Sequence, residues 1–328
     1  MSANTSAFLF SAQNGKEEKG MKILCIGAAV MDITGYPIDR QMEWKEKQRI
    51  SGIRIQPGGD AVNQCAALAA FGAEPALAAC VGADMNGKIL KSTLDGMEIE
   101  VSGVKEKEGH ATGTAMVLVG QTGERHVFSV QGAHSTLSKD ALPWELPAEC
   151  RAVSLASIFS MPELERDGLL EYLSMVKSQG KLVFADLAAD KLGLGLKGIE
   201  AFLPYIDYFL PSLYDVLGMT GTKTAQEAAE VFHSLGTAHV IIKCGEKGCY
   251  CSGKAFKGQI PAVQVQTVDT TGAGDCMSGV FAARILAGDD IETACRYACA
   301  AGSYSTLFSG AWAEGLSEET VREFVRHH

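Results

Sequence analysis

The sequence lacks any apolar run that approaches the roughly 20 residues needed for a membrane-spanning helix. It is also poor in positive charge, because 29 Lys and Arg residues are set against 39 Asp and Glu residues, giving a formal net charge of −10. This balance argues against nucleic acid or an anionic membrane surface as a partner. It leaves room for a nucleotide pocket, because such a pocket can bind phosphates through local backbone donors.

The ten cysteines lack the paired spacing and the nearby histidines of a zinc site. Most of them lie within apolar segments, which is typical of reduced thiols in a cytoplasmic protein rather than of a disulfide framework. Cys244, Cys249 and Cys251 lie close together in the sequence. We interpret them as small buried residues and regard a metal site there as the weaker alternative.

The N-terminal segment, residues 1–20, lacks a basic start, and its apolar stretch at 7–10 is too short for a secretory signal. We therefore predict a disordered leader over residues 1–20 and a folded domain over residues 21–328. No G-x-G-x-x-G motif follows the first apolar run at 22–27, which makes a dinucleotide-dependent oxidoreductase a poor fit.

From about residue 148 onward, short apolar runs alternate with amphipathic segments. We predict strands at 153–158, 181–186, 205–210, 240–243 and 248–252, and helices at 162–178, 225–235 and 276–286. An alternation of strand and helix predicts an α/β protein with a mostly parallel central sheet that helices cover on both faces.

The stretch Asp269–Asp275, DTTGAGD, joins the end of a predicted strand to a buried helix. Gly272 and Gly274 lack side chains, so backbone N–H groups can approach an anion closely, and the helix start adds a positive dipole end. A carboxylate beside such a site is useful if Asp275 takes a proton from a hydroxyl while the amides stabilise a moving phosphoryl group. The alternative from these residues alone is a glycine turn with Asp275 as the helix N-cap.

A second glycine motif, Gly58-Gly59-Asp60 followed by Asn63, leads into an alanine-rich helix. Together the two stretches resemble the PfkB, or ribokinase-like, carbohydrate kinase family, whose members have G-G-x-x-x-N in the N-terminal third and D-x-x-G-A-G-D in the C-terminal third. The resemblance runs from about Met21 to the C-terminus. It implies a three-layer αβα ribokinase-like fold, with ATP and Mg²⁺ used to phosphorylate a hydroxymethyl group of a sugar or related polyhydroxy compound.

The resemblance also implies roles for individual residues. Asp275 would be the general base, and the backbone of Gly272, Ala273 and Gly274 would form the anion hole. The residues that would bind the acceptor are Asp32, Gly58, Gly59, Asp60 and Asn63. The residues that would bind the nucleotide are Ser212, Lys243, Gly245, Gly248, Thr270, Gly272, Gly274 and Ser303.

Two ion sites are implied in the same way. Many relatives have N-x-x-E where this chain has Ser212 and Asp215. The resemblance implies that Asp215 would coordinate Mg²⁺ through water. An equal alternative is that Ser212 starts a helix and Asp215 lies in its first turn. In potassium-dependent relatives, backbone carbonyls hold a K⁺ ion, and by position these are Asp269, Thr271, Ser305, Phe308 and Gly310. By side chain, Phe308 and Trp312 are more typical of core aromatics.

The segments 37–57 and 101–130 carry alternating polar and apolar residues, and a glycine turn at 122–123 predicts a hairpin. In the family, two such pieces form a small β-sheet lid over the substrate. A homodimer of this protein would be expected to form through the lid.

Asp32 follows the first predicted strand, where α/β folds bind ligands, and Asp60 adds a second acid at the same mouth unless it only caps its helix. Two carboxylates disfavour an anionic acceptor, so we expect a neutral or amine-bearing sugar, polyol or nucleoside. A nucleoside kinase of the same family remains an alternative, with Phe128 or Met116 contacting the base. A non-catalytic sugar-binding sensor is a second alternative, although it would not need Asp275.

Overall fold

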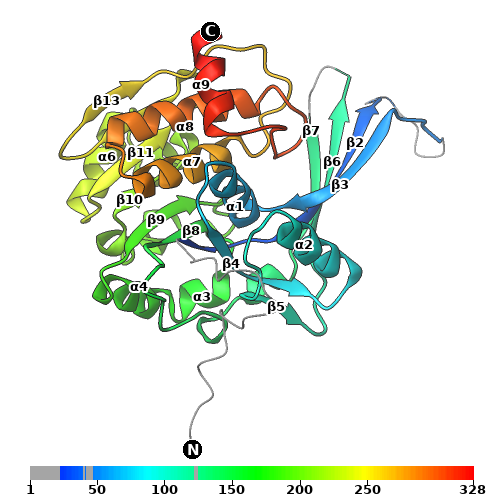
Figure 1. The fold of residues 1–328 in the computed structure, drawn as a ribbon. Coiled ribbons are helices and arrows are strands. Elements are labelled where there is room, and N and C mark those ends of the chain that lie inside the picture. The colour runs from blue at the N-terminus through cyan, green and yellow to red at the C-terminus, as the bar shows by residue number, and fades with distance from the viewer. Residues whose placement is uncertain (1–22, 40, 42–46, 122–124) are drawn as a thin grey trace, which may run out of the picture.

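The computed structural model describes residues 23–39, 41, 47–121 and 125–328, which form two sheets and the helices around them (Figure 1). Within these residues, the larger sheet has nine strands in the order β13-β12-β11-β10-β9-β8-β1-β4-β5, and the smaller has the order β3-β2-β6-β7. The predicted leader over 1–20 and the predicted hairpin turn at 122–123 lie outside the described residues.

The larger sheet is the centre of the molecule. Its strands are β1 (Ile23–Ile26), β4 (Pro75–Gly82), β5 (Val104–Lys107), β8 (Ala152–Ile158), β9 (Leu182–Leu187), β10 (Tyr208–Phe209), β11 (His239–Lys243), β12 (Cys249–Ser252) and β13 (Lys257–Ile260). Neighbouring strands from β5 to β11 run parallel, whereas β12 and β13 add an antiparallel edge. The prediction of a mostly parallel sheet is confirmed.

Helices cover both faces of this sheet (Figure 1). One face packs against α1 (Asp60–Ala70), α2 (Met85–Gly96), α7 (Ala273–Ala287) and α8 (Ile291–Ser305). The other packs against α3 (Pro162–Arg166), α4 (Leu169–Ser178), α5 (Leu213–Thr220) and α6 (Ala225–Ser234), and α9 (Glu318–His327) lies against α8. Successive β1 side chains alternate between the two cores, since Leu24 joins one and Cys25 the other. The predicted three-layer αβα fold is therefore confirmed.

The helices that carry the two glycine motifs pack unusually closely. Gly279 of α7 faces α1, and a Cβ at Gly279 would lie 2.7 Å from the Gln64 carbonyl oxygen and 2.8 Å from the Ala67 Cβ. Small residues at this crossing let the two backbones approach. The first turns of α1 and α7, which are far apart in sequence, consequently lie side by side.

The smaller sheet extends away from the body, on the right of Figure 1. Its strands are β2 (Val30–Ile38), β3 (Gly52–Gly58), β6 (Gly113–Gly120) and β7 (Arg125–Val130). It begins earlier in the chain than the predicted 37–57 segment. Residues 104–107, which fall within the predicted 101–130 segment, instead form β5 of the larger sheet, because their backbone completes the parallel edge beside β4.

The strand register fixes which side chains share a face of the smaller sheet, because directly paired residues point the same way and neighbours alternate. Asp32 belongs to a row with Gln56, Ala115 and Ser129. Ile33 belongs to the adjacent row with Ile55, Met116 and Phe128. The two rows therefore lie on opposite faces.

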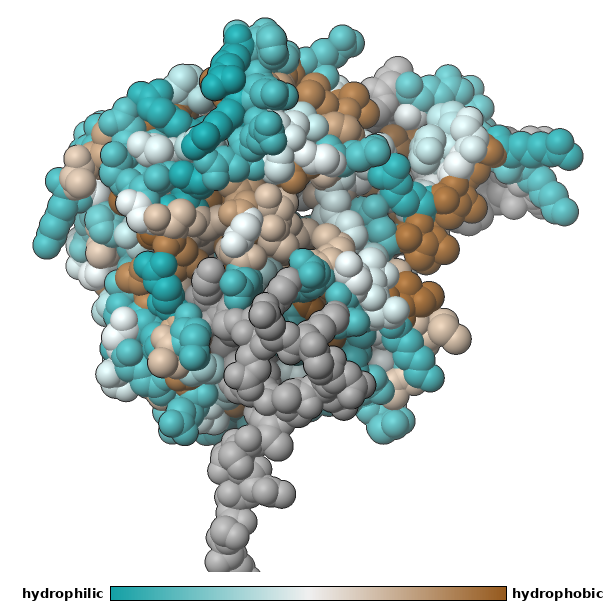
Figure 2. Space-filling view, viewed as in Figure 1, coloured by the Kyte–Doolittle hydropathy of each residue, from teal (hydrophilic) through white to brown (hydrophobic). Residues whose placement is uncertain are grey.

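The Asp32 face is turned toward the body, because Arg54, two residues from Gln56 on the same face, donates a hydrogen bond to the Ser309 carbonyl. We call the opposite side the outer face and define it by Ile55, Met116 and Phe128. These three side chains are 60%, 46% and 53% exposed. Hydrophobic side chains also gather over this part of the molecule in Figure 2.

Candidate active site

Acidic side chains from separate elements converge on one pocket of about 360 Å³. Asp60 begins α1, Asp186 lies near the end of β9, and Asp275 lies in the first turn of α7. Lys243, the last residue of β11, lines the same pocket. The carboxyl ends of parallel strands and the starts of the helices meet at one edge of the sheet, which is where ligands bind in such folds.

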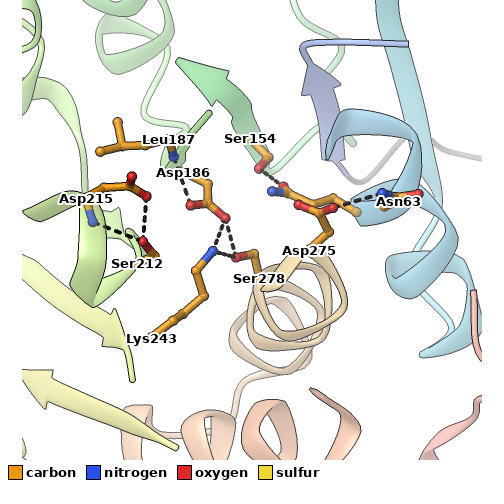
Figure 3. A network of polar contacts seen from close by, with 10 residues as sticks. Asn63, Ser154, Asp186, Leu187, Ser212, Asp215, Lys243, Asp275 and Ser278 are labelled. Carbon is orange, nitrogen blue, oxygen red and sulfur yellow. Dashed lines mark hydrogen bonds and ion pairs between the residues drawn. The ribbon is translucent and has the colours of Figure 1, made fainter. Parts of the chain in front are cut away.

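Asp275 is held by Asn63, whose Nδ2 donates a 2.9 Å hydrogen bond to Asp275 Oδ2 (Figure 3). Burial, and next the negative charge of Asp60, raise the pKa of the Asp275 carboxyl well above its usual range. The Asn63 hydrogen bond and the Lys243 charge oppose that rise. A carboxylate with a raised pKa is a better proton acceptor at neutral pH. The N-cap of α7 is Gly272, so the alternative of Asp275 as the helix N-cap is wrong.

Lys243 is anchored by an ion pair with Asp186 and a 3.3 Å contact between its Nζ and Ser278 Oγ (Figure 3). Ser278 Oγ in turn donates to Asp186 Oδ2 at 2.7 Å. The second Asp186 oxygen accepts the Leu187 amide at 2.8 Å. The carboxylate is therefore well satisfied. Sequence analysis gave no role to Asp186 or Ser278, although an acid at the end of a buried strand was the signal used for Asp32.

The start of α7 is the predicted anion site. The first hydrogen bond of the helix runs from the Cys276 amide to the Gly272 carbonyl at 2.8 Å, so the Gly274 and Asp275 amides precede the helical hydrogen bonds. The Ala273 amide makes a long 3.3 Å contact to the Thr270 carbonyl oxygen. Gly272 has φ 71°, and a Cβ there would lie 2.7 Å from the Ala311 carbonyl oxygen. Only glycine fits this turn without strain.

Lys243 reaches the same anion site from the side. Its Nζ lies 3.4 Å from where a Gly274 Cβ would stand, so a side chain at 274 would press against the ammonium. Backbone amides and a fixed ammonium thus face the same space, which suits a phosphate oxygen.

The predicted acceptor residues lie together at the roots of β2, β3 and α1. A Cβ at Gly58 would lie 2.1 Å from Asp32 Oδ2, and Gly59, with φ 92°, would place one 2.6 Å from the Ala28 carbonyl oxygen. Both glycines are therefore required by close approach. Burial raises the pKa of Asp32 to about 6.

Asp60 is the first residue of α1, and its N-cap is Gly59 without a side-chain cap, so Asp60 does not cap the helix. Burial and the Asp186 charge raise the pKa of Asp60 to about 6, while a hydrogen bond from Ser157 and the Lys243 charge oppose this. Its carboxyl faces the pocket rather than the helix end.

On the nucleotide side, Ser212 and Lys243 are bridged by backbone pairing. Ser212 caps α5: its Oγ accepts the Asp215 amide at 3.2 Å and donates to Asp215 Oδ2 at 2.5 Å. The helix-start alternative thus describes the local geometry, and a magnesium role for Asp215 stays a prediction. The predicted Gly245–Gly248 turn follows Lys243 directly, and a Cβ at Gly248 would lie 2.1 Å from the Ile260 carbonyl oxygen.

The remaining predicted nucleotide and potassium residues surround the loop before α7. Asp269 Oδ1 accepts the Thr271 amide at 2.9 Å and the Thr271 hydroxyl at 2.7 Å, and Asp269 Oδ2 accepts the Gly310 amide at 2.9 Å. Ser305 O accepts the Phe308 amide at 3.2 Å. Thr270 is exposed beside the anion site, and Ser303 is buried on α8. The hydrogen bonds of Asp269 tie the loop before α7 to the loop after α8. The role of these residues in binding a monovalent cation stays a prediction.

The pocket residues missed by sequence analysis also include Gln131, His134, Phe159 and Lys191. Phe159 has φ 80°, a conformation that costs a non-glycine residue energy and often marks a functional site. Glu165 Oε1 holds that loop by accepting the Phe159 amide at 2.8 Å and the Met161 amide at 2.9 Å. These residues lie in loops or, for His134, in a short 3-10 helix over 133–136, and their approach to the pocket has no periodic sequence signal.

In the parts of the chain that the structure describes, no helix is long and apolar enough to span a bilayer. All ten cysteines are free thiols. Cys249 and Cys251 are fully buried and Cys244 is partly buried, in agreement with their interpretation as small core residues.

Backbone amides at a helix start, a lysine ammonium and a buried carboxyl with a raised pKa lie around one pocket, an arrangement suited to the transfer of a phosphoryl group to an alcohol. A family model described as pfkB family carbohydrate kinase matches residues 21–316. The chain belongs to this family, and it is a carbohydrate kinase.

Individual proteins that this chain resembles include ribokinases. The chain is 28% identical over 280 residues to a ribokinase of Haemophilus influenzae, across 84% of this chain and 89% of that protein. It superposes on the crystal structure of a Thermotoga maritima ribokinase with a TM-score of 0.78 at 27% identity, covering 93% of this chain and 99% of the other. An E. coli protein provisionally named ribokinase II, solved with ATP and Mg²⁺, gives a TM-score of 0.82 at 24% identity, covering 94% and 99%.

Proposed function

We propose that this kinase transfers the γ-phosphoryl group of ATP to a hydroxymethyl group of a neutral sugar or related polyhydroxy compound, with Asp275 as the general base. The observation that carries the proposal is the position of Asp275. Its carboxylate is fixed by Asn63 at 2.9 Å, beside the open N-terminus of α7 and in one pocket with Lys243. A base, an anion site and a cation are all within one small space.

In the proposed step, the acceptor oxygen attacks the γ-phosphorus and its proton passes to Asp275. The new O–P bond forms as the bond from phosphorus to the bridging oxygen breaks, and ADP leaves. The Gly272–Asp275 backbone and Lys243 stabilise the charge on the transferring oxygens, which is where most of the catalysis of phosphoryl transfer arises. Mg²⁺ bound with the nucleotide would neutralise phosphate charge, and Asp215 is the residue that would reach it through water.

The acceptor would be bound by Asp32, Asp60 and Asn63. Two carboxylates favour hydroxyl donors and oppose an acidic acceptor, and the Lys243 charge offsets them only in part because it is paired with Asp186. Lys191 also lines the pocket, so sugar acids must be part of any acceptor screen.

The small sheet is proposed to act as the lid, with its Asp32 face closing over the acceptor. Closure would exclude water and limit hydrolysis of ATP. Its outer face is proposed to form a homodimer contact, since three large apolar side chains that point away from the body are 46% to 60% exposed in one row. A cytoplasmic location is proposed because Cys249 and Cys299 keep free thiols with sulfur atoms 3.5 Å apart.

A nucleoside acceptor remains the second candidate, now for a different reason. Met116 and Phe128 lie on the outer face, opposite Asp32, so the earlier expectation that they contact a base is wrong. Phe159 is the aromatic side chain that lines the pocket with Asp60 and Asp275, and its ring could stack on a base. The non-catalytic sensor alternative is wrong, because the chain is a member of the carbohydrate kinase family.

A panel of ketoses, aldoses, polyols, sugar acids and nucleosides, incubated with ATP and Mg²⁺, tests the proposal. Mass spectrometry should detect a phosphorylated product from at least one neutral member. ATP consumption alone is not a sufficient readout, because water can also act as acceptor. Nucleosides as the best substrates would favour the second candidate, and no product from any member would count against the proposed reaction class.

A further inference from the structure

Trp312 lies in the loop between α8 and α9 and touches the candidate active site through Asn63. Its indole Nε1 donates to Asn63 Oδ1 at 3.1 Å, and Asn63 Nδ2 donates to Asp275 Oδ2 at 2.9 Å. Asn63 is 7% exposed, and Trp312 packs against the core beneath α1 and α7. The three side chains therefore form one continuous chain of hydrogen bonds.

This chain has a fixed direction. An indole N–H can only donate, so the Asn63 amide must turn its oxygen toward Trp312 and its NH₂ group toward Asp275. The two ends of an amide have nearly the same shape, so packing alone would not choose between them. With the amide reversed, Asn63 Oδ1 would face the Asp275 carboxylate, and two acceptors would meet.

The loop that carries the indole is held by hydrogen bonds to two other segments. The backbone just before Trp312 is anchored twice, because Gly310 N donates to Asp269 Oδ2 at 2.9 Å and the Ser309 carbonyl accepts from Arg54. The backbone that leads to Trp312 is thus tied to β3 and to the loop before α7.

We propose that Trp312 is a positioning residue for phosphoryl transfer, which orients the Asn63 amide so that its N–H group always faces the base Asp275. The inference rests on the proposed role of Asp275. It assigns to Trp312 more than the core-packing role that its sequence suggests, and it makes the loop between α8 and α9 a part of the acceptor side of the site.

The charges that face Asp275 give the expected sign for pH dependence. Asp60 on α1 and Asp186 on β9 raise the pKa of Asp275, as burial does, while Lys243 on β11 and the Asn63 hydrogen bond lower it. The negative charge of Asp32 on β2 raises the pKa of Asp60 in the same cluster. Loss of the correct amide orientation removes the hydrogen bond that lowers the pKa of Asp275, so Asp275 stays protonated to higher pH. Because the base must be ionised to accept a proton, the acidic limb of the activity profile should move to higher pH.

The test compares Trp312→Phe with Trp144→Phe. Trp144 is a matched control, because its Nε1 also donates one hydrogen bond, to the Lys139 carbonyl at 3.2 Å. Its ring is partly buried against the core on the opposite face of the larger sheet, which α3 to α6 cover. Trp312→Phe should lower kcat about 3- to 10-fold, the effect of one lost hydrogen bond, with a smaller change in acceptor KM. The acidic limb should move to higher pH in Trp312→Phe alone. Thermal unfolding of both variants checks that each is folded.

A double-mutant cycle separates positioning from packing. In an Asn63→Ala background, Trp312→Phe should have no further effect on kcat/KM, because the amide that Trp312 orients is gone. Full additivity, or a Trp312→Phe enzyme with wild-type kcat and pH profile, would overturn the inference. If Asp275→Asn is inactive in the same assays, the proposed function survives that outcome; an active Asp275→Asn enzyme would instead overturn the proposed function itself.

Discussion

The Lys243 ammonium is ion-paired with the Asp186 carboxylate, and their side chains are only 13% and 5% exposed. The pair lines the same pocket as Asp60 and Asp275, and Lys243 also lies beside the start of α7. Lys243 lowers the pKa of both Asp60 and Asp275, whereas Asp186 raises them. The pair therefore sets the electrostatic balance of the site, while its own charges nearly cancel.

Lys243→Met tests this balance. We expect kcat to fall about 10²–10³-fold, as when a charge-stabilising donor is lost, and the acidic limb of the profile to move to higher pH because Asp275 loses a neighbouring cation. The stability should also fall, since Asp186 becomes a buried unpaired charge. Lys243→Met combined with Asp186→Asn should recover stability in chemical denaturation without recovering turnover. The exposed Lys254→Met is the control, and a Lys243→Met enzyme with wild-type kcat would contradict the assignment.

Asp275→Asn tests the base. Turnover should fall by at least about 10²–10⁴-fold, the usual effect of losing a general base. The acceptor KM should change little, because asparagine keeps the shape of the side chain. Steady-state kinetics with the best acceptor of the panel measures both values. The exposed Asp95→Asn on α2 is the control, and near-normal turnover in Asp275→Asn would remove Asp275 from its role.

Asp32→Ala and Asp60→Ala test how the acceptor is recognised. Asp32→Ala should raise the acceptor KM about 10- to 100-fold, because a hydrogen bond to a charged group contributes about 1.5–3 kcal/mol. Asp60→Ala should act mainly on selectivity, by improving kcat/KM for acidic acceptors relative to neutral ones. A sugar acid as the best acceptor of the wild-type enzyme would show that the charge argument is wrong.

We expect a monovalent cation to activate the enzyme, because the predicted cation-binding carbonyls lie in the loops before α7 and after α8, which Asp269 ties together. Activity in K⁺ should exceed activity in a tetramethylammonium buffer of equal ionic strength, because the large organic cation cannot fit a ring of backbone carbonyls. The measurement is kcat at several nucleotide concentrations. Equal rates in both salts would remove the cation site from the proposal.

The lid dimer is tested by two neighbouring residues on opposite faces of β7. Phe128 and Val127 are both 53% exposed, but Phe128 lies on the outer face and Val127 on the Asp32 face. Phe128→Lys should convert a dimer to a monomer in light scattering, because burying an ammonium in an apolar contact is costly. Val127→Lys should leave the oligomeric state unchanged. An unchanged state in Phe128→Lys would contradict the proposed interface.

Much of the fold was determined by the sequence alone. Short apolar runs alternating with amphipathic segments were enough for a mostly parallel, two-sided sheet, because burial on both faces leaves few other arrangements for such a pattern. Gly272 and Asp275 could be singled out in the same way, since a glycine turn before a helix has a local physical meaning. The limits of the predicted helix over 162–178 could not be set as well, and it is divided at Gly168, whose φ is 123°.

Only the tertiary structure decided which of these local features meet. Asp186, Ser278 and Lys243 come from three elements, and their contact depends on the order of strands in the sheet and on how closely α7 packs. The outward direction of Phe128 follows from strand register, where a shift of one residue reverses every side chain. Trp312 and Asn63 are 249 positions apart, and no spacing in the sequence encodes their hydrogen bond. Such contacts arise from packing between distant segments, whereas sequence patterns report the local preferences of each segment by itself.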